Sequence, residues 1–155
     1  MLVSPKSLDE EHEELIHSLR SCATYKNGVG RVVSDLLEVL EPHFEKEQKL
    51  VMPLLGSISD LVSGEKISNL KEIADEQARL VQEYQKMFEE HGRVRDLILK
   101  AKKAARDEGD QEVIELLNGL AHHARIEEEV LYPSALLAGT VAKCLIPPEQ
   151  SNGIA

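Results

Sequence analysis

The chain has 155 residues, enough for one domain with its own hydrophobic core. Its apolar content of 42% is that of a globular protein, and an aromatic content of only 3%, beside abundant Leu, Glu, Lys and Ala, favours helices over sheets. A formal net charge of −10 argues against a nucleic-acid partner, which needs a basic face, and against binding to an anionic membrane.

The sequence carries no membrane or export signal that we recognise. No run approaches the roughly 20 apolar residues that cross a bilayer. The N-terminal residues lead into an acidic stretch rather than into a signal peptide. Cys22 and Cys144 lie far apart in the chain, and two free thiols in a reducing compartment are favoured over a disulfide. We therefore expect a soluble cytoplasmic protein.

Turn residues and the helical spacing of apolar residues predict four long helices. They span approximately residues 5–24, 29–55, 66–106 and 110–137. The first helix has two candidate starts, Ser4-Pro5 and a capping box formed by Ser7 and Glu10. Lys26-Asn27-Gly28 separates the first two helices, and Gly109 ends the third.

The connection between the two predicted hairpins is longer than a tight bundle loop. It runs from residue 56 to about 76, so either the third helix projects beyond the bundle at its start or residues 66–76 form a separate short helix. We divide the chain into a helical domain of residues 1–137 and a C-terminal tail of residues 138–155. The apolar stretch from Val141 to Ile146 could pack on the bundle, and the last residues are expected to fray.

Each half of the chain repeats one pattern, a Glu-Glu-His triplet followed by a later His, Glu and Pro. In the first half these are Glu10-Glu11-His12, His43, Glu47 and Pro53, and in the second half they are Glu89-Glu90-His91, His123, Glu127 and Pro133. The later residues match at a separation of 80 positions, from 43 to 123, and the triplets match at 79, from 12 to 91. The repeat predicts two helical hairpins that together build one metal site with approximate two-fold symmetry.

Helical phase separates the six histidines into two kinds. Four of them, His12, His43, His91 and His123, lie on or beside the apolar stripes of their helices. The other two, His17 and His122, lie roughly opposite those stripes and should face solvent.

Glu47 and Glu127 also lie near the apolar stripes, each four residues after a selected histidine. Burying either carboxylate without a partner costs several kcal/mol. Imidazoles and carboxylates are ligands for first-row divalent metals, and the spacing of four places them one turn apart. The predicted ligands are therefore His12, His43, Glu47, His91, His123 and Glu127. This set suits two metal ions that share bridging carboxylates; Zn²⁺ or Mn²⁺ would accept many of these ligands, and a plain structural bundle is the weaker alternative.

The segments from Leu40 to Glu47 and from His123 to Pro133 resemble the hemerythrin-like, or HHE cation-binding, family. His12 and His91 match the single histidines of that family's first and third helices, so the resemblance covers residues of about 5–137. It implies an all-α, up-down-up-down antiparallel four-helix bundle. It also implies two non-haem iron ions, Fe²⁺ or Fe³⁺, with an oxo or hydroxo bridge, that bind O₂ or NO.

The chain departs from the oxygen-carrying members at one position. They have a second histidine one turn after the ligand of the third helix, and this position is Arg95 here. Their last carboxylate would correspond to Glu128, whereas analogy with members that have four histidines and two glutamates favours Glu127. The layout looks closer to the di-iron proteins linked to repair of damaged iron centres and to iron or oxygen sensors.

Three functions are consistent with these features. The first is a di-iron protein that binds or senses O₂ or NO, or that handles iron. The second is an enzyme that acts on peroxide or nitric oxide, or that repairs damaged iron centres. The third is a metal-stabilised module whose acidic surface recruits a protein partner.

Overall fold

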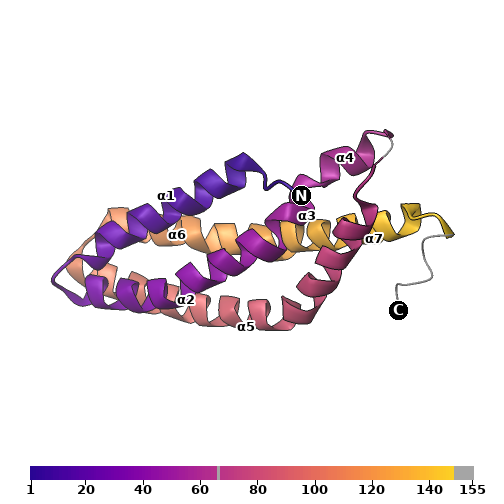
Figure 1. Ribbon diagram of the computed structural model, residues 1–155. Coiled ribbons are helices and arrows are strands. Elements are labelled where there is room, and N and C mark those ends of the chain that lie inside the picture. The colour runs from indigo at the N-terminus through magenta and orange to yellow at the C-terminus, as the bar shows by residue number, and fades with distance from the viewer. Residues whose placement is uncertain (66, 149–155) are drawn as a thin grey trace.

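The computed structural model describes residues 1–65 and 67–148, and within them the protein is built from helices without a strand, as predicted (Figure 1). The helices are α1 (Lys6–Ala23), α2 (Gly28–Leu50), α3 (Met52–Gly56), α4 (Ile58–Val62), α5 (Leu70–Glu108), α6 (Gln111–Ile126), the π-helical segment η1 (Glu127–Leu131) and α7 (Tyr132–Leu145). The final residues, 149–155, for which fraying was expected, lie outside the described part of the chain.

Two short turns fold the long helices into hairpins. The side chain of Asn27 caps α2 by accepting hydrogen bonds from the backbone N–H groups of Val29 and Gly30, at 3.0 and 3.3 Å. Gly109 ends α5 in the left-handed conformation, with φ of 69°, and Asp110 caps α6 through the N–H of Val113 at 3.1 Å. Both turns lie at the same end of the molecule, and α2 packs along α5 (Figure 1).

The observed boundaries differ from the predicted ones in three places. The second predicted helix stops at Leu50 and is followed by the short helices α3 and α4. The third predicted helix begins at Leu70, later than its predicted start near 66, and residues 70–76 belong to it rather than to a separate short helix. The last helix continues through α7 to Leu145, beyond its predicted end near 137. Its buried Ala142 packs in the core, as expected for the apolar stretch after residue 140.

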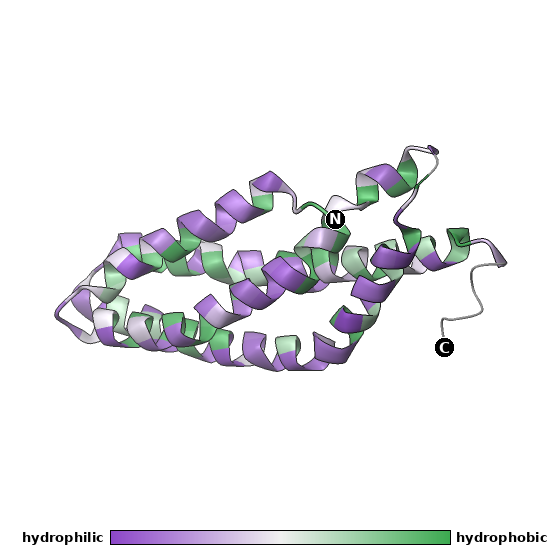
Figure 2. Ribbon diagram, viewed as in Figure 1, coloured by the Kyte–Doolittle hydropathy of each residue, from purple (hydrophilic) through white to green (hydrophobic). Residues whose placement is uncertain are grey.

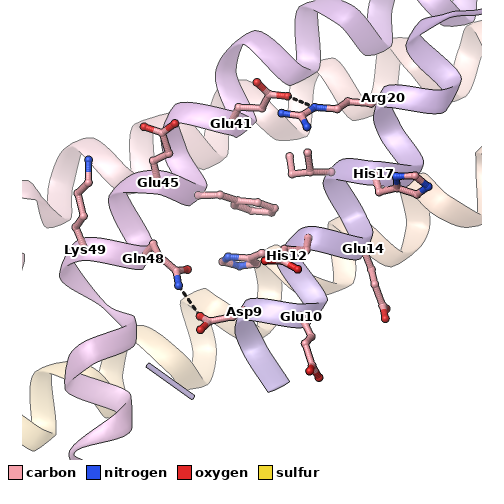
Figure 3. Close-up of a pocket in the computed structure, with 13 residues that line it drawn as sticks. Asp9, Glu10, His12, Glu14, His17, Arg20, Glu41, Glu45, Gln48 and Lys49 are labelled. Atoms are coloured by element: carbon pink, nitrogen blue, oxygen red, sulfur yellow. Dashed lines mark hydrogen bonds and ion pairs between the residues drawn. The ribbon is translucent and has the colours of Figure 1, made fainter. Parts of the chain in front are cut away.

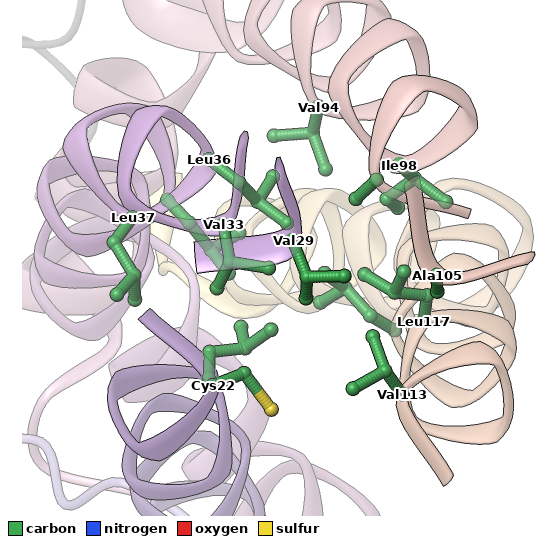
Figure 4. Close-up of a cluster of buried hydrophobic side chains, with 14 of the residues drawn as sticks. Cys22, Val29, Val33, Leu36, Leu37, Val94, Ile98, Ala105, Val113 and Leu117 are labelled. Atoms are coloured by element: carbon green, nitrogen blue, oxygen red, sulfur yellow. The ribbon is translucent and has the colours of Figure 1, made fainter. Parts of the chain in front are cut away.

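The apolar side chains form two buried clusters, and hydrophilic residues cover the outer faces of the helices (Figure 2). Cluster 1 lies toward the hairpin turns and includes Leu36, Ile98 and Leu117 (Figure 4). Cluster 2 joins α3, the first half of α5 and α7, and includes Leu54 and Leu80.

The chain crosses from one cluster to the other at the predicted ligands. On α2, His43 and Glu47 lie between Leu40 of cluster 1 and Val51 of cluster 2. On α5, His91 lies between Met87 of cluster 2 and Val94 of cluster 1. The polar site is therefore placed between two apolar cores, which hold the surrounding helices in position.

Two expectations about the environment can be compared with the structure. Both cysteines are free thiols, with Cys22 buried and Cys144 exposed, as predicted. Among the described helices, none is both long enough and apolar enough to cross a membrane.

Candidate metal centre

All six predicted ligands are buried, and the structure brings them together at the middle of the helices. They form two overlapping groups, of which the first contains His43, Glu47, His91 and Glu127 and the second contains His12, His123 and Glu127. Each group draws on both hairpins, because His43 and His91 belong to α2 and α5, while His12 and His123 belong to α1 and α6. His17 and His122 are exposed, as helical phase predicted.

In each group the Nε2 atoms of two histidines face each other. The distance between the Nε2 atoms of His43 and His91 is 2.9 Å, and between those of His12 and His123 it is 3.0 Å. The four imidazoles therefore point the same ring nitrogen toward the interior of the bundle.

The two carboxylates each reach from one group of histidines to the other. Glu127 places Oε1 2.6 Å from His123 Nε2 and Oε2 3.1 Å from His91 Nε2. Glu47 places Oε1 3.1 Å from His43 Nε2 and Oε2 3.4 Å from His12 Nε2. Each carboxylate thus presents one oxygen to each histidine pair, which is the arrangement that a bridging ligand requires.

Outer carboxylates hold three of the four rings by their other nitrogen. The Nδ1 of His43 lies 2.7 Å from Glu90, that of His91 lies 2.9 Å from Glu128, and that of His123 lies 3.1 Å from Glu11. An ionised carboxylate only accepts hydrogen bonds, so Nδ1 donates its proton in each case and a neutral ring keeps a lone pair on Nε2. Such outer-sphere carboxylates are typical of histidines that bind metals.

Paired lone pairs separated by about 3 Å repel each other unless a proton or a cation lies between them. The carboxylates add to this repulsion, because buried negative charge must be compensated. Glu47 Oε2 also has no hydrogen-bond partner among the described residues. The chemistry of this donor set fits a metal ion, and the buried His and Glu groups could hold one.

His12 differs from the other three histidines. Its Nδ1 is buried and has no hydrogen-bond partner in the described part of the chain. The ring is held instead by stacking on Phe44, with ring centroids 3.8 Å apart and planes inclined by 6°. The repeat places Gln48 where Glu128 lies in the second half, 80 positions apart, but Gln48 donates to Asp9 at 2.6 Å.

The structure distinguishes the two glutamates that the sequence left as alternatives. Glu127 is 1% exposed and contributes to both groups. Glu128 lies outside the groups, where it accepts hydrogen bonds from His91 and, at 2.6 Å, from Arg95 Nη1. Within the described part of the chain, Arg95 therefore contacts the centre through this outer carboxylate.

Without a metal, the contacts within the cluster shift the pKa values of His43, His123 and Glu127 toward their charged forms. Burial alone would lower the pKa of His123, but the hydrogen bonds and charges of Glu127 and Glu11 outweigh it and raise that pKa to about 9. Burial alone would also lower the pKa of His43, but its contacts with Glu47 and Glu90 outweigh burial and raise that pKa. Burial would likewise raise the pKa of Glu127, but hydrogen bonds from three histidines hold it well below its usual range. These shifts favour bound protons at His43 and His123, and a metal would have to displace them.

Tyr132 is a residue of the centre that sequence analysis missed. It is fully buried, and its hydroxyl donates a short hydrogen bond to Glu47. The same oxygen lies 3.2 Å from Nε2 of both His43 and His91. The phenol therefore lies at the first group of ligands. The repeat supplies no second phenol, because the matching position of the first half, 80 residues earlier, is Met52.

The π-helical segment η1 explains why helical phase did not select Tyr132. The backbone N–H of Tyr132 donates to the carbonyl of Glu127, five residues earlier. The next residue, Pro133, has no N–H and interrupts regular hydrogen bonding. A regular helix turns about 100° per residue and would place Tyr132 about 140° from Glu127. The wider turn of η1 reduces this angle and brings both side chains inside.

No protein-family model matches the chain, and no curated protein or solved structure matches it significantly.

Proposed function

We propose that the chain is a non-haem di-iron protein of the hemerythrin-like type, which binds or senses O₂ or NO or handles iron. His12, His43, His91 and His123 would be terminal ligands, and Glu47 and Glu127 would bridge the two ions. A bound iron pair would supply reversible redox chemistry and a coordination position for a diatomic ligand. The proposed fold is an up-down-up-down antiparallel four-helix bundle, formed by α1, α2, α5 and the last helix from α6 through α7.

One observation carries the proposal of a dinuclear site. Each of the two buried carboxylates presents one oxygen to each pair of facing Nε2 atoms, so six protein ligands surround two adjacent positions. Hydrogen bonds among uncharged groups would not require this arrangement. The iron assignment rests on the motif resemblance, since imidazole and carboxylate ligands also suit other first-row metals.

The chain's own residues would tune such a site in two ways. The carboxylates of Glu11, Glu90 and Glu128 hold the Nδ1 atoms of three histidines, which fixes the rings with Nε2 pointing inward. The two apolar clusters lie on either side of the centre and bury its proposed ligands.

The proposal is tested with protein that has been reduced and loaded with Fe²⁺ without air. We expect a new visible absorption band on addition of O₂ or NO, and we expect it to disappear when the gas is removed. Protein that carries His43→Ala and His123→Ala should give no such band. Two bound irons without any spectral response to either gas would contradict ligand binding while leaving the metal site intact.

A second candidate is an enzyme that reduces peroxide or nitric oxide at the same centre. The observation that favours it is the hydroxyl of Tyr132, a hydrogen-bond donor within 3.2 Å of two proposed ligand atoms. Turnover of peroxide or nitric oxide beyond one equivalent, reduced in Tyr132→Phe, would favour the enzyme. Stoichiometric binding without turnover would favour the carrier or sensor.

A further inference from the structure

A surface cleft between α1 and α2 leads to one of the proposed ligands. The cleft has a volume of about 940 Å³, and its lining includes His12, Phe44 and Gln48. Figure 3 shows His12 extending from α1 toward α2, beside the hydrogen bond that joins Asp9 to Gln48. His12 belongs to the second ligand group, which has three protein residues where the first has four.

The walls of this cleft are predominantly acidic. Its carboxylates are those of Asp9, Glu10, Glu13, Glu14, Glu41 and Glu45. The basic residues of the lining are His17, Arg20 and Lys49, and Arg20 is paired with Glu41 at 2.8 Å. A concave surface with an excess of one charge concentrates the opposite ions and accelerates their association.

His12 is suited to receive an ion from this cleft because its ring is not fixed in the way the other three are. The Nδ1 atoms of His43, His91 and His123 are held by carboxylates, whereas that of His12 is buried without a partner in the described residues. The ring is 5% exposed, and stacking on Phe44 holds it in place of a hydrogen bond at Nδ1. A buried side chain that is a proposed ligand, and whose Nδ1 has no partner among the described residues, therefore lines the acidic cleft.

A second groove, between α2 and α5, provides a comparison. It has a volume of about 690 Å³, and its lining carries three acidic residues, among them Asp35 and Glu38, and three basic ones. None of the six proposed ligands lines it, and Lys46 forms an ion pair with Glu90 within it. Glu90 in turn holds Nδ1 of His43, so this side of the centre is covered by a fixed outer contact.

From these features we propose that divalent metal ions reach the centre through the α1–α2 cleft, and that His12 is the first ligand to receive them. This inference rests on the proposed metal centre and adds its route of loading. The acidic walls attract the cation, and His12, whose Nδ1 no carboxylate holds, passes it to the position that it shares with His123 and Glu127.

The test compares the rate of metal loading in two charge-reversed variants, with Co²⁺ as the probe. Metal-free protein is mixed with Co²⁺ at low ionic strength, and the visible absorption of the bound ion is followed in a stopped-flow instrument. The cleft variant carries Glu13→Lys and Glu45→Lys, both at exposed positions of the cleft. The matched control carries Asp35→Lys and Glu38→Lys, which are exposed and line the other groove.

We expect the cleft variant to load roughly tenfold more slowly than the unmodified protein, and the control to load at its normal rate. The difference should shrink at high salt, because screening weakens attraction by exposed charges. All three proteins should bind the same final amount of Co²⁺. Equal slowing in both variants, or no slowing in the cleft variant, would overturn the route. Failure of the unmodified protein to bind Co²⁺ would instead overturn the metal centre itself.

Discussion

Glu90 illustrates how a single residue outside the ligand set controls the centre. Its carboxylate accepts a hydrogen bond from His43 Nδ1 at 2.7 Å and also pairs with Lys46. Burial would raise the pKa of Glu90, but these two contacts outweigh it and lower the pKa, so the group stays ionised near neutrality. An ionised acceptor at Nδ1 both orients the ring and increases the basicity of Nε2.

Replacing this carboxylate should weaken metal binding without removing a ligand. We expect Glu90→Gln to lower the affinity for metal by about 10-fold to 100-fold, the usual effect of losing an outer-sphere partner. Competition with a chromophoric chelator measures this loss. The neighbouring Glu89 is exposed, so Glu89→Gln should leave the affinity unchanged and serves as the matched control. A similar loss in both variants would show that surface charge, rather than the contact with His43, is responsible.

The raised pKa of His123 predicts opposite effects of pH on the metal-free and metal-loaded protein. The folded-state pKa of about 9 exceeds the ordinary value of 6.5, so protonation stabilises the metal-free fold. That contribution is complete below about pH 6.5 and is lost as the pH rises through about 9. Metal binding requires the unprotonated ring, so affinity should rise over the same interval and binding should release protons.

Titration calorimetry in buffers with different ionisation enthalpies measures this proton release, and thermal unfolding followed by circular dichroism measures stability. Affinity that is independent of pH between 7 and 9 would contradict the proposed role of His123 as a ligand.

The burial of individual histidines was predictable because they share a helical phase and occur twice. The repeat and the apolar stripes select His12, His43, His91 and His123 and reject His17 and His122, and the burial of each agrees with this choice. Tyr132 was not predictable in this way, since the π-helical turn before it changes the phase. Glu11 and Glu90 were part of the observed repeat, but spacing along the chain does not reveal that each holds a histidine of another helix.

At the scale of helices, the close approach of α5 and α7 depends on one glycine. A Cβ atom added at Gly139 would lie 2.2 Å from Cβ of Gln77 on α5. Gln77 is fixed there by hydrogen bonds from its amide to the carbonyl of Leu136 at 2.7 Å and to the hydroxyl of Thr140 at 3.0 Å. The two helices can pack at this distance only because position 139 has no side chain.

Gly139→Ala should therefore lower the free energy of unfolding by roughly 1–3 kcal/mol, the usual cost of overpacking. Gly119, within α6, has nothing within 4 Å of an added Cβ. Gly119→Ala should instead raise the free energy of unfolding, by about 1 kcal/mol, because Ala favours a helix more than Gly does. Urea denaturation measures both changes. A stabilising effect of Gly139→Ala would show that α7 does not pack on α5 as described.

The predicted helices were correct where turn residues mark their ends. Asn27 caps α2 and Gly109 ends α5, both at the positions where the sequence indicated a break. The interruption at Val51, the short helices α3 and α4, and the extension of the last helix to Leu145 were not predicted. These features depend on packing in cluster 2, whose residues come from distant parts of the chain, and local spacing does not reveal such contacts.

For the whole molecule, the buried polar centre lies between the two hairpins and takes side chains from both. Four histidines and two carboxylates would be a costly interior for a bundle without a metal, since each buried charge needs compensation. The approximate two-fold repeat places one His-x-x-x-Glu element on each hairpin, so a bound metal pair would join all the helices that supply ligands. Metal content is therefore the property that follows most directly from the proposed centre.

The most direct test is the number of metal ions bound per chain after anaerobic reconstitution with Fe²⁺, measured by elemental analysis. The unmodified protein should bind two, and protein that carries His43→Ala and His123→Ala should lose this stoichiometric binding. Protein that carries His17→Ala and His122→Ala, in which the same number of histidines is removed from the surface, should still bind two. Two ions in the first variant, or loss of binding in the second, would contradict the assignment of the centre.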